Sequence, residues 1–311
     1  MRDAHPAVVH VHRRYVAGGR DARPYGGAVL DRYARAAPGW AAGAAHVYGP
    51  LARALVDAAP HPLAGRRVLD AGAGTGLAGD ALTTAGARPV ALDVSAPMLT
   101  AVPGDQPRVV GSVLALPLAD AAMDDAVAAF VLNHVHAPVA ALAELARVVR
   151  PDGAVLATVM SAGNSSPVRD RIDVVARAHG FTPPDWYAEL TGEQAPLLGS
   201  ADRMARAAHE AGLVAVRVEE APADLGLTDP AALVDYRLGQ AQFADWLAGL
   251  DPRTRSAIRA EALAAVAPGM EPYRPGVVQL TAQVPGDPVD PGADAAWRVR
   301  RPAGADTGGR R

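Results

Sequence analysis

The sequence predicts an α/β fold: a doubly wound, mostly parallel sheet of seven strands, with the last strand antiparallel. Short apolar runs alternate regularly with helical stretches, which is the rhythm of strand–helix–strand units. The runs are apolar along most of their length, as strands are when helices cover both faces of a parallel sheet. The first five strands are expected at about residues 66–71, 88–93, 107–112, 124–131 and 153–160.

The chain around these strands is expected to be helical, with an irregular segment at each end. Residues 1–24 mix Arg, His and Gly without periodicity, which predicts a flexible N-terminus. From Gly26 to Asp57 apolar residues recur at helical spacing and predict a helical segment before the first strand. Residues 285–311 are rich in Pro, Gly, Asp and Arg, so a disordered tail is expected there.

Two helices with a loop between them are expected after the fifth strand. The first spans Pro167 to Gly180, and residues 183–187 form the loop. The second begins after Ser200, a good N-cap residue, and stops at Gly212, a residue that commonly ends helices.

The remaining chain predicts two more strands, at about residues 213–220 and 277–284, with a helical block over residues 229–267 between them. This block and the preceding helices connect strands near the carboxyl edge of the sheet. Because open α/β sheets bind ligands at that edge, we expect both blocks to form one helical cap over the site.

The most informative stretch is the end of the first strand, where Asp70 is followed by glycines at alternate positions, Gly72, Gly74 and Gly76. A buried strand that enters such a turn lets a ligand lie against bare backbone. The turn opens into a helix, whose first N–H groups also face the ligand.

Two ligands compete for this turn. Residues 74–79 match G-x-G-x-x-G, the dinucleotide pattern, which favours NAD. A carboxylate at Asp70 instead favours a cation such as S-adenosylmethionine, which carries an ammonium and a sulfonium. Asp93 ends the next strand, where a carboxylate can accept hydrogen bonds from both hydroxyls of a ribose. Because both NAD and S-adenosylmethionine contain such a ribose, Asp93 does not distinguish between them. Asp70 is the residue that favours the methyl donor.

These residues resemble motif I of the class I S-adenosylmethionine-dependent methyltransferases, in the branch of type 11 and quinone-biosynthesis C-methyltransferases. Residues 114–120, 124–131 and 143–153 resemble later segments of that family in order and spacing. The resemblance implies a Rossmann-like core with its N-terminal helices over residues 25–160. Cap insertions and the final two strands of the same sheet then fill residues 161–284.

The resemblance also implies which residues hold the cofactor. Asp70 and the glycine turn would hold the methionine portion, Asp93 and Val94 the ribose, and Ser112 with Val113 the adenine. Ser112 departs from the family, which usually has an acidic residue there; a neutral hydroxyl gives a weaker hydrogen bond. Because crossovers bring the carboxyl ends of the strands to one edge, Asn133 is expected in the same crevice.

Methyl transfer from a sulfonium is an in-line displacement that needs alignment, exclusion of water and, for a protonated acceptor, removal of a proton. His134 follows the fourth strand directly, and two roles stay open for it: a general base, or a group that packs or hydrogen-bonds without taking a proton. His136 is the second catalytic candidate, although its place before Ala137-Pro138 favours a helix-entry role.

Four residues of the expected cap are candidates for binding the acceptor. Trp186 and Tyr187 follow two prolines, and Tyr236 lies in the helical block, where a place in the apolar core is the alternative. Arg274 could face a carboxylate or phosphate, or could be an ordinary surface arginine.

Composition excludes several other classes. The chain has 311 residues, a net charge of −3 and no basic stripe, which argues against nucleic-acid binding. With no cysteine there is no disulfide or thiolate nucleophile, and no metal site is predicted. The absence of a membrane-length apolar run or a signal-peptide pattern predicts a cytoplasmic enzyme. The oligomeric state cannot be read from these patterns.

The predicted function is methyl transfer to O, N or C of a small organic acceptor, such as a specialised metabolite. A cyclase or pericyclase that uses the bound cofactor for shape and charge alone is the first alternative. A nicotinamide-dependent oxidoreductase is the second.

Overall fold

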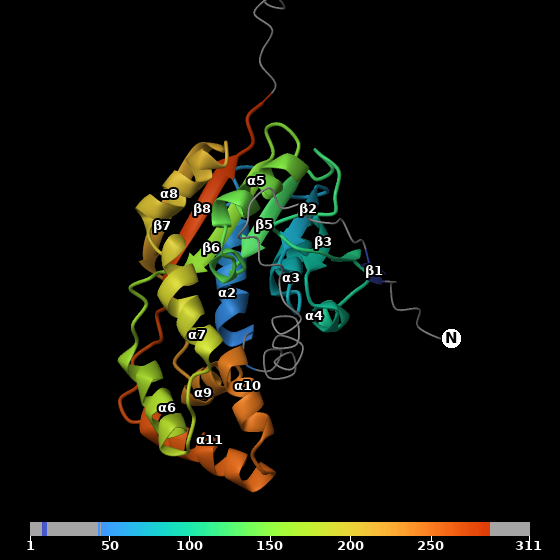
Figure 1. Ribbon diagram of the computed structural model, residues 1–311. Helices are drawn as coiled ribbons and strands as arrows, with labels where there is room; N and C mark the ends of the chain where they lie inside the picture. Colours follow the sequence, from blue (N-terminus) through green and yellow to red (C-terminus); the bar gives the residue numbers. More distant parts are fainter. Residues whose placement is uncertain (1–7, 11–42, 44, 287–311) are drawn as a thin grey trace, which may run out of the picture.

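The computed structural model describes residues 8–10, 43 and 45–286. Eight strands form one sheet in the order β1-β4-β3-β2-β5-β6-β8-β7 (Figure 1). β8 pairs antiparallel with both its neighbours, and the other described pairs are parallel. The strands are β1 (Val8–His10), β2 (Arg67–Ala71), β3 (Arg88–Asp93), β4 (Arg108–Val110), β5 (Asp125–Ala129), β6 (Ala154–Met160), β7 (Val214–Pro222) and β8 (Gly276–Gln283).

The predicted doubly wound sheet of seven strands, with an antiparallel last strand, is confirmed by β2 to β8. The additional edge strand β1 pairs parallel with β4, Val8 opposite Arg108. β1 lies in the stretch for which we predict a flexible N-terminus. The sequence does not predict this strand, because three residues are too few to produce a periodic pattern.

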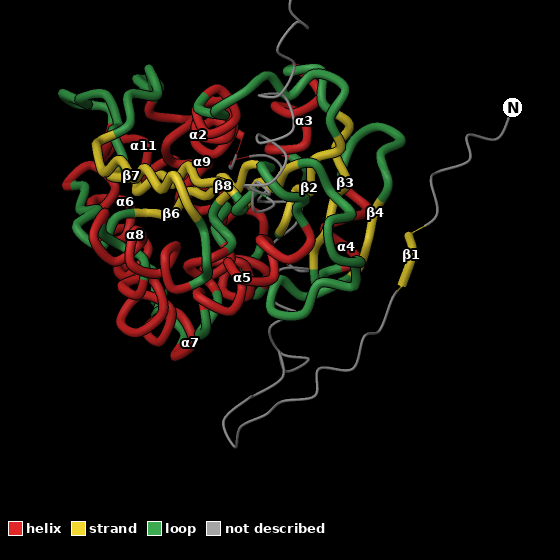
Figure 2. The backbone as a smooth tube through the Cα atoms, turned by 90° about the horizontal axis from the view of Figure 1, so that it is seen from above, coloured by secondary structure: helices red, strands yellow, loops and turns green. Residues whose placement is uncertain are grey.

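Helices cover both faces of the sheet (Figure 2). Alternate residues of β2 show why: Val68 packs with Leu55 and Leu82 on one face, whereas Leu69 packs with Leu142 on the other. The helices are α2 (Ala45–Asp57), α3 (Leu77–Thr84), α4 (Ala96–Ala101), α5 (Pro138–Val148), α6 (Pro167–Ala178), α7 (Asp185–Glu189), α8 (Ala201–Glu210), α9 (Pro230–Leu238), α10 (Ala241–Ala248) and α11 (Pro252–Val266). Among the described residues, no helix has both the length and the apolarity needed to cross a bilayer.

The helices after β6 begin largely where capping residues predict. Ser200 caps α8 by accepting a hydrogen bond from the Arg203 backbone N–H, and Gly212 follows that helix with a φ of 82°. The predicted loop over residues 183–187 holds only for Pro183 and Pro184, because the chain enters α7 at Asp185, directly after Pro184 as the N-cap. The block at residues 229–267 is three helices, α9 to α11.

A separate apolar cluster joins the helices beyond the sheet. Ile172 of α6, Leu233 of α9, Phe243 of α10 and Ile258 of α11 belong to it and are fully buried. α2 contributes Val47 to the same cluster. These helices lie together at one end of the sheet in Figure 1, and α2 links them to the strands.

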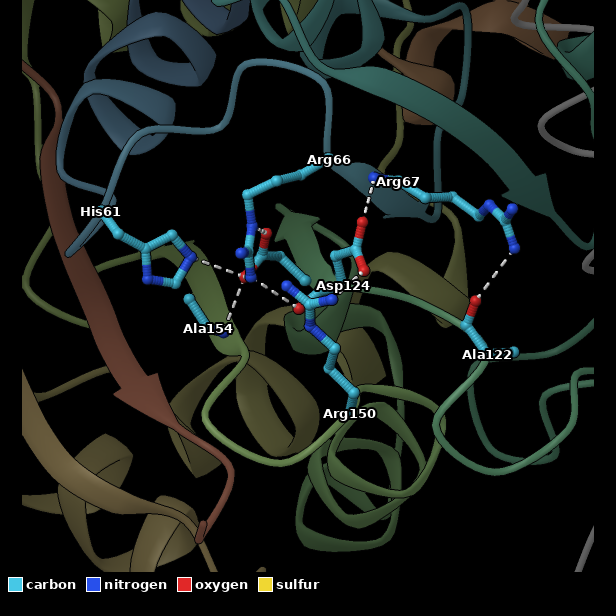
Figure 3. A network of polar contacts seen from close by, with 8 residues as sticks. His61, Arg66, Arg67, Ala122, Asp124, Arg150 and Ala154 are labelled. Atoms are coloured by element: carbon cyan, nitrogen blue, oxygen red, sulfur yellow. Dashed lines mark hydrogen bonds and ion pairs between the residues drawn. The ribbon is translucent and has the colours of Figure 1, made fainter.

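A polar network lies at the opposite end of the strands, where β5 begins. The fully buried carboxylate of Asp125 accepts hydrogen bonds from Arg66 and from His61 Nε2 and Ala154 N at 2.9 and 2.8 Å. Figure 3 shows His61, Arg66 and Ala154 converging from three segments. Burial raises the pKa of Asp125, but these donors outweigh burial, and the net pKa lies below its usual value. The network therefore ties the chain before β2 to β5 and β6.

Candidate active site

The turn after β2 adopts a conformation that favours glycine. Gly72, Gly74 and Gly76 have φ values of 73°, 54° and 94°, which lie in the left-handed region. A Cβ on Gly72 would lie 2.4 Å from the Val131 side chain, whereas a Cβ on Gly74 would have no atom within 4 Å. Gly74 therefore borders open space, and its bare backbone forms part of a cavity wall.

Asp93 holds this turn against the end of β3. Its two carboxylate oxygens accept hydrogen bonds from Gly74 N at 2.9 Å and from Ser95 N at 2.8 Å. Burial raises the pKa of Asp93, and these backbone donors oppose the shift. Each carboxylate oxygen has a second lone pair, so Asp93 can still accept from a ligand in the cavity that it lines.

Asp70 is a buried carboxylate without a hydrogen-bond partner. Its residue is 1% exposed, and neither oxygen has a partner among the described residues. Burial raises its pKa to about 7; the nearby Gly79 backbone lowers it in part, and the charges of Asp93 and Asp80 raise it further. An unpaired carboxylate of this kind is costly unless a positive group neutralises it.

One cavity joins these residues at the carboxyl ends of β2 and β3. Of the predicted site residues, it contains Asp70, Gly72, Gly74, Asp93, Val94, Val113 and His134. Three others lie outside its lining. A Cβ added to Gly76 would lie 3.0 Å from the Val102 side chain. Ser112 Oγ accepts a hydrogen bond from Leu114 N at 3.1 Å. Asn133 is buried, and its Oδ1 has no partner among the described residues.

A second cavity, of about 350 Å³, lies beneath the helices that follow β6. Trp186, Tyr187 and Tyr236, three of the residues predicted to bind the acceptor, line it. Arg274 lies outside both cavities and pairs with Asp224 at 2.9 Å, with both side chains more than half exposed.

Tyr48 and His134 line both cavities, so the two spaces meet at this pair. His134 ends a short 3-10 helix over Leu132–His134, and burial lowers its pKa to about 4. Its ring is therefore neutral near pH 7. His136, two residues later, is exposed and lines neither cavity.

Tyr48 and Phe130 are site residues that the sequence patterns did not single out. The Tyr48 ring meets Phe130 edge-on at 4.7 Å and Tyr236 at 5.7 Å, and burial raises the pKa of Tyr48 to about 12. Phe130 has a φ of 60° and is held by a backbone hydrogen bond to Thr158 O at 2.8 Å. Such strain in a non-glycine residue is often found at functional sites. Phe130 directly follows β5, which ends at the edge of the sheet where ligands bind, and this position is the sequence signal that could have identified it.

Comparison with known families gives the same assignment as the glycine turn. Residues 69–157 match the model of a family described as a methyltransferase domain. This part of the chain is a class I S-adenosylmethionine-dependent methyltransferase domain. Its cofactor is S-adenosylmethionine.

Individual methyltransferases are similar to parts of the chain. A malonyl-[acyl-carrier protein] O-methyltransferase from Serratia marcescens is 34% identical over 162 residues, covering 50% of this chain and 63% of the relative. A demethylmenaquinone methyltransferase from Renibacterium salmoninarum is 38% identical over 120 residues, covering 38% of this chain and 51% of the relative. The chain thus spans only about half to three fifths of these relatives. The structure of a phosphoethanolamine N-methyltransferase 2 from Haemonchus contortus in complex with S-adenosylmethionine has 16% identity and a TM-score of 0.49, covering 76% of this chain and 52% of that one.

The residues of the cavity at the carboxyl ends of β2 and β3 suit this cofactor. Asp70 supplies an unpaired buried carboxylate where a cationic ligand needs one, and Gly74 leaves room in the wall that a side chain would fill. The cavity lining contains two carboxylates, Asp70 and Asp93, and no arginine among the described residues. This charge pattern favours a cation over a pyrophosphate.

Proposed function

We propose that the protein transfers a methyl group from S-adenosylmethionine to O, N or C of a small organic acceptor. The observation that carries the proposal is the junction of two cavities at Tyr48 and His134. One cavity has the features that a cationic cofactor requires. The other is large enough for a small molecule and has aromatic walls.

In this proposal the chain binds each part of the cofactor with a different element. Asp70 and the bare backbone of Gly74 hold the charged methionine portion, and Asp93 accepts from the ribose hydroxyls. Val94 borders the ribose, and Val113 faces the adenine. When bound, S-adenosylmethionine supplies a methyl group that its positively charged sulfur activates for in-line displacement.

His134 acts in this proposal as a group that orients the acceptor. With a pKa of about 4, its neutral ring accepts a hydrogen bond from an acceptor O–H or N–H but holds a proton weakly. Tyr48, whose pKa is about 12, keeps its proton and stays neutral. The two side chains border both cavities, so they exclude water from the junction and fix the approach of the acceptor.

The test uses an equal mixture of S-adenosylmethionine with a CH3 and with a CD3 methyl group. The protein is incubated with this mixture and an extract of microbial small molecules, and products are sought by mass spectrometry as CH3/CD3 doublets. We expect doublets only with active protein, and stabilisation against heat by S-adenosylhomocysteine but not by NAD.

Two variants sharpen the test. His134→Gln is expected to lower turnover without loss of S-adenosylhomocysteine binding, whereas His209→Gln, on the exposed surface of α8, should leave both unchanged. A product of unchanged mass would contradict methyl transfer and favour the cyclase. Stabilisation by NAD alone would contradict the cofactor assignment.

A further inference from the structure

The two cavities have opposite charge patterns. The cofactor cavity contains Asp70 and Asp93, whereas the second cavity contains Arg169 and Arg237. No Asp or Glu is among the described residues that line the second cavity. An anion entering it therefore meets cationic side chains without a facing carboxylate.

Arg237 is already engaged and serves as a support for the wall. Its Nε and Nη2 donate to the two carboxylate oxygens of Asp173 at 2.7 and 2.6 Å. Nη1 donates to Gln240, and the guanidinium lies 5.2 Å from the centre of the Phe243 ring. Because Asp173 neutralises it inside the protein, Arg237 contributes little free charge to the cavity.

Arg169 differs, because its charge has only a long ion pair with an exposed carboxylate. Its Nε is buried and has no hydrogen-bond partner among the described residues. Nη2 donates to the Asn164 backbone carbonyl at 3.2 Å, and the nearest carboxylate oxygen, of Asp170, is 3.8 Å away on a side chain that is 60% exposed. A guanidinium carries five N–H donors in a fixed fork, and the Arg169 side chain lines the cavity and is 19% exposed, so its guanidinium has donors to offer to a ligand anion.

The neutral polar residues around it are largely occupied within the protein. Ser161 Oγ donates to Glu220, and Thr191 Oγ1 donates to the Tyr187 carbonyl. Gln242 Nε2 donates to Gln240 at 3.0 Å. Arg169 is thus the charged group of this wall with a donor left over for a ligand.

Another part of the lining is aromatic. Trp186 and Tyr187 of α7 lie edge-on to each other at 5.9 Å, and Tyr236 of α9 lies near the junction beside Tyr48. Flat rings favour a planar apolar body over a flexible polar one.

We propose that the acceptor is a planar, aromatic molecule that carries an anionic oxygen group, and that Arg169 binds this group through its guanidinium. The inference rests on the proposed function, since it assigns the second cavity to the acceptor. A carboxylate and a phosphate ester share the required chemistry, because both accept the guanidinium fork. Arg169 is thereby a specificity-determining residue. It lies on the first turn of α6, where its backbone N–H donates a hydrogen bond to the side chain of the N-cap residue Ser166.

The test measures binding of three probes to protein saturated with S-adenosylhomocysteine: 4-hydroxybenzoate, phenyl phosphate and the neutral 4-hydroxybenzamide. Saturation-transfer NMR detects weak binding of each probe. We expect at least one anionic probe to bind about tenfold or more tightly than the amide, and the comparison of carboxylate with phosphate identifies the anion. Equal or tighter binding of the amide, or no binding of either anion, would overturn the proposal.

Matched variants locate the effect. Arg169→Gln should abolish the preference for the anion while leaving S-adenosylhomocysteine binding intact. Arg171→Gln, an exposed position of the same helix outside the cavity, should retain it. An unchanged preference in Arg169→Gln would overturn the assignment. If S-adenosylhomocysteine fails to bind, or if no methylated product forms, the proposed function itself is contradicted. The probe comparison by itself tests only the anion preference of the second cavity.

Discussion

Replacement of Asp70 by Asn should stabilise the ligand-free protein and weaken its binding of cofactor. Burial raises the Asp70 pKa from its ordinary 3.8 to about 7. An acid whose folded pKa is raised leaves stability unaffected below its unfolded pKa and lowers stability progressively as pH rises to the folded pKa. A shift of about three units corresponds to about 4 kcal/mol. Because the new amide also lacks a partner, we expect a net gain of about 2 to 4 kcal/mol at pH 8.

The same carboxyl should make cofactor binding depend on pH. If the ammonium of the ligand requires an ionised Asp70, a pKa of about 7 leaves about 3% of the protein competent at pH 5.5 and nearly all of it at pH 8.5. Affinity for S-adenosylhomocysteine should therefore rise about 30-fold over this range in the original protein. The Asn variant should bind weakly at every pH, without this rise.

Two measurements check these numbers. Urea unfolding at pH 5 and pH 8 gives the free energy of unfolding, and calorimetric titration with S-adenosylhomocysteine gives affinity and proton release. At pH 6 about 0.9 proton should leave per ligand bound, because Asp70 is then mostly protonated. Asp105→Asn, at an exposed loop position, controls for loss of a negative charge. An equal pH dependence in Asp70→Asn, or a variant less stable than the original at pH 8, would refute the reasoning.

Three further substitutions test other parts of the structure. Asp125→Asn should lower the free energy of unfolding by about 2 to 3 kcal/mol at pH 7. Because the pKa of Asp125 is lowered in the folded protein, its stabilising contribution is lost as pH falls. Urea unfolding should therefore show a smaller difference between variant and original protein near pH 3. Asp173→Asn leaves Arg237 buried without its counter-charge and should cost about 3 to 5 kcal/mol, whereas Asp170→Asn, exposed on the same helix, should shift the thermal midpoint little. Gly74→Val places its side chain in the cavity and strains the turn at a φ of 54°, and it should lower S-adenosylhomocysteine affinity more than tenfold while the circular dichroism spectrum at 25 °C still shows a folded protein. Equal effects of Asp173→Asn and Asp170→Asn, or full ligand affinity in Gly74→Val, would contradict these assignments.

The strands were predictable because their burial is imposed by the fold as a whole. The strand expected at residues 88–93 is found at Arg88–Asp93, since a run that is apolar on both faces has few other places in a globular protein. Local chemistry likewise predicted the Ser200 cap. It failed at α7, because two prolines favour a loop and yet are also compatible with the residues just before a helix.

The site was only partly predictable, for a geometric reason. Asp70 and Gly74 lie on the strand end and turn that define the ligand edge, so their sequence context indicated their place. Tyr48 reaches the site through the packing of α2 across the sheet. Arg169 looks like an ordinary helix-surface charge, and only the folding of α6 over the second cavity shows its unpaired Nε.

The central claim is that a cofactor cavity and an acceptor cavity meet at Tyr48 and His134. A crystal structure with S-adenosylhomocysteine bound tests it most directly. We predict that the ligand's sulfur faces these two side chains and opens toward the second cavity, with its ammonium beside Asp70 and its ribose beside Asp93. A sulfur turned away from the junction, or an adenosine lying in the second cavity between Trp186 and Arg169, would contradict the account.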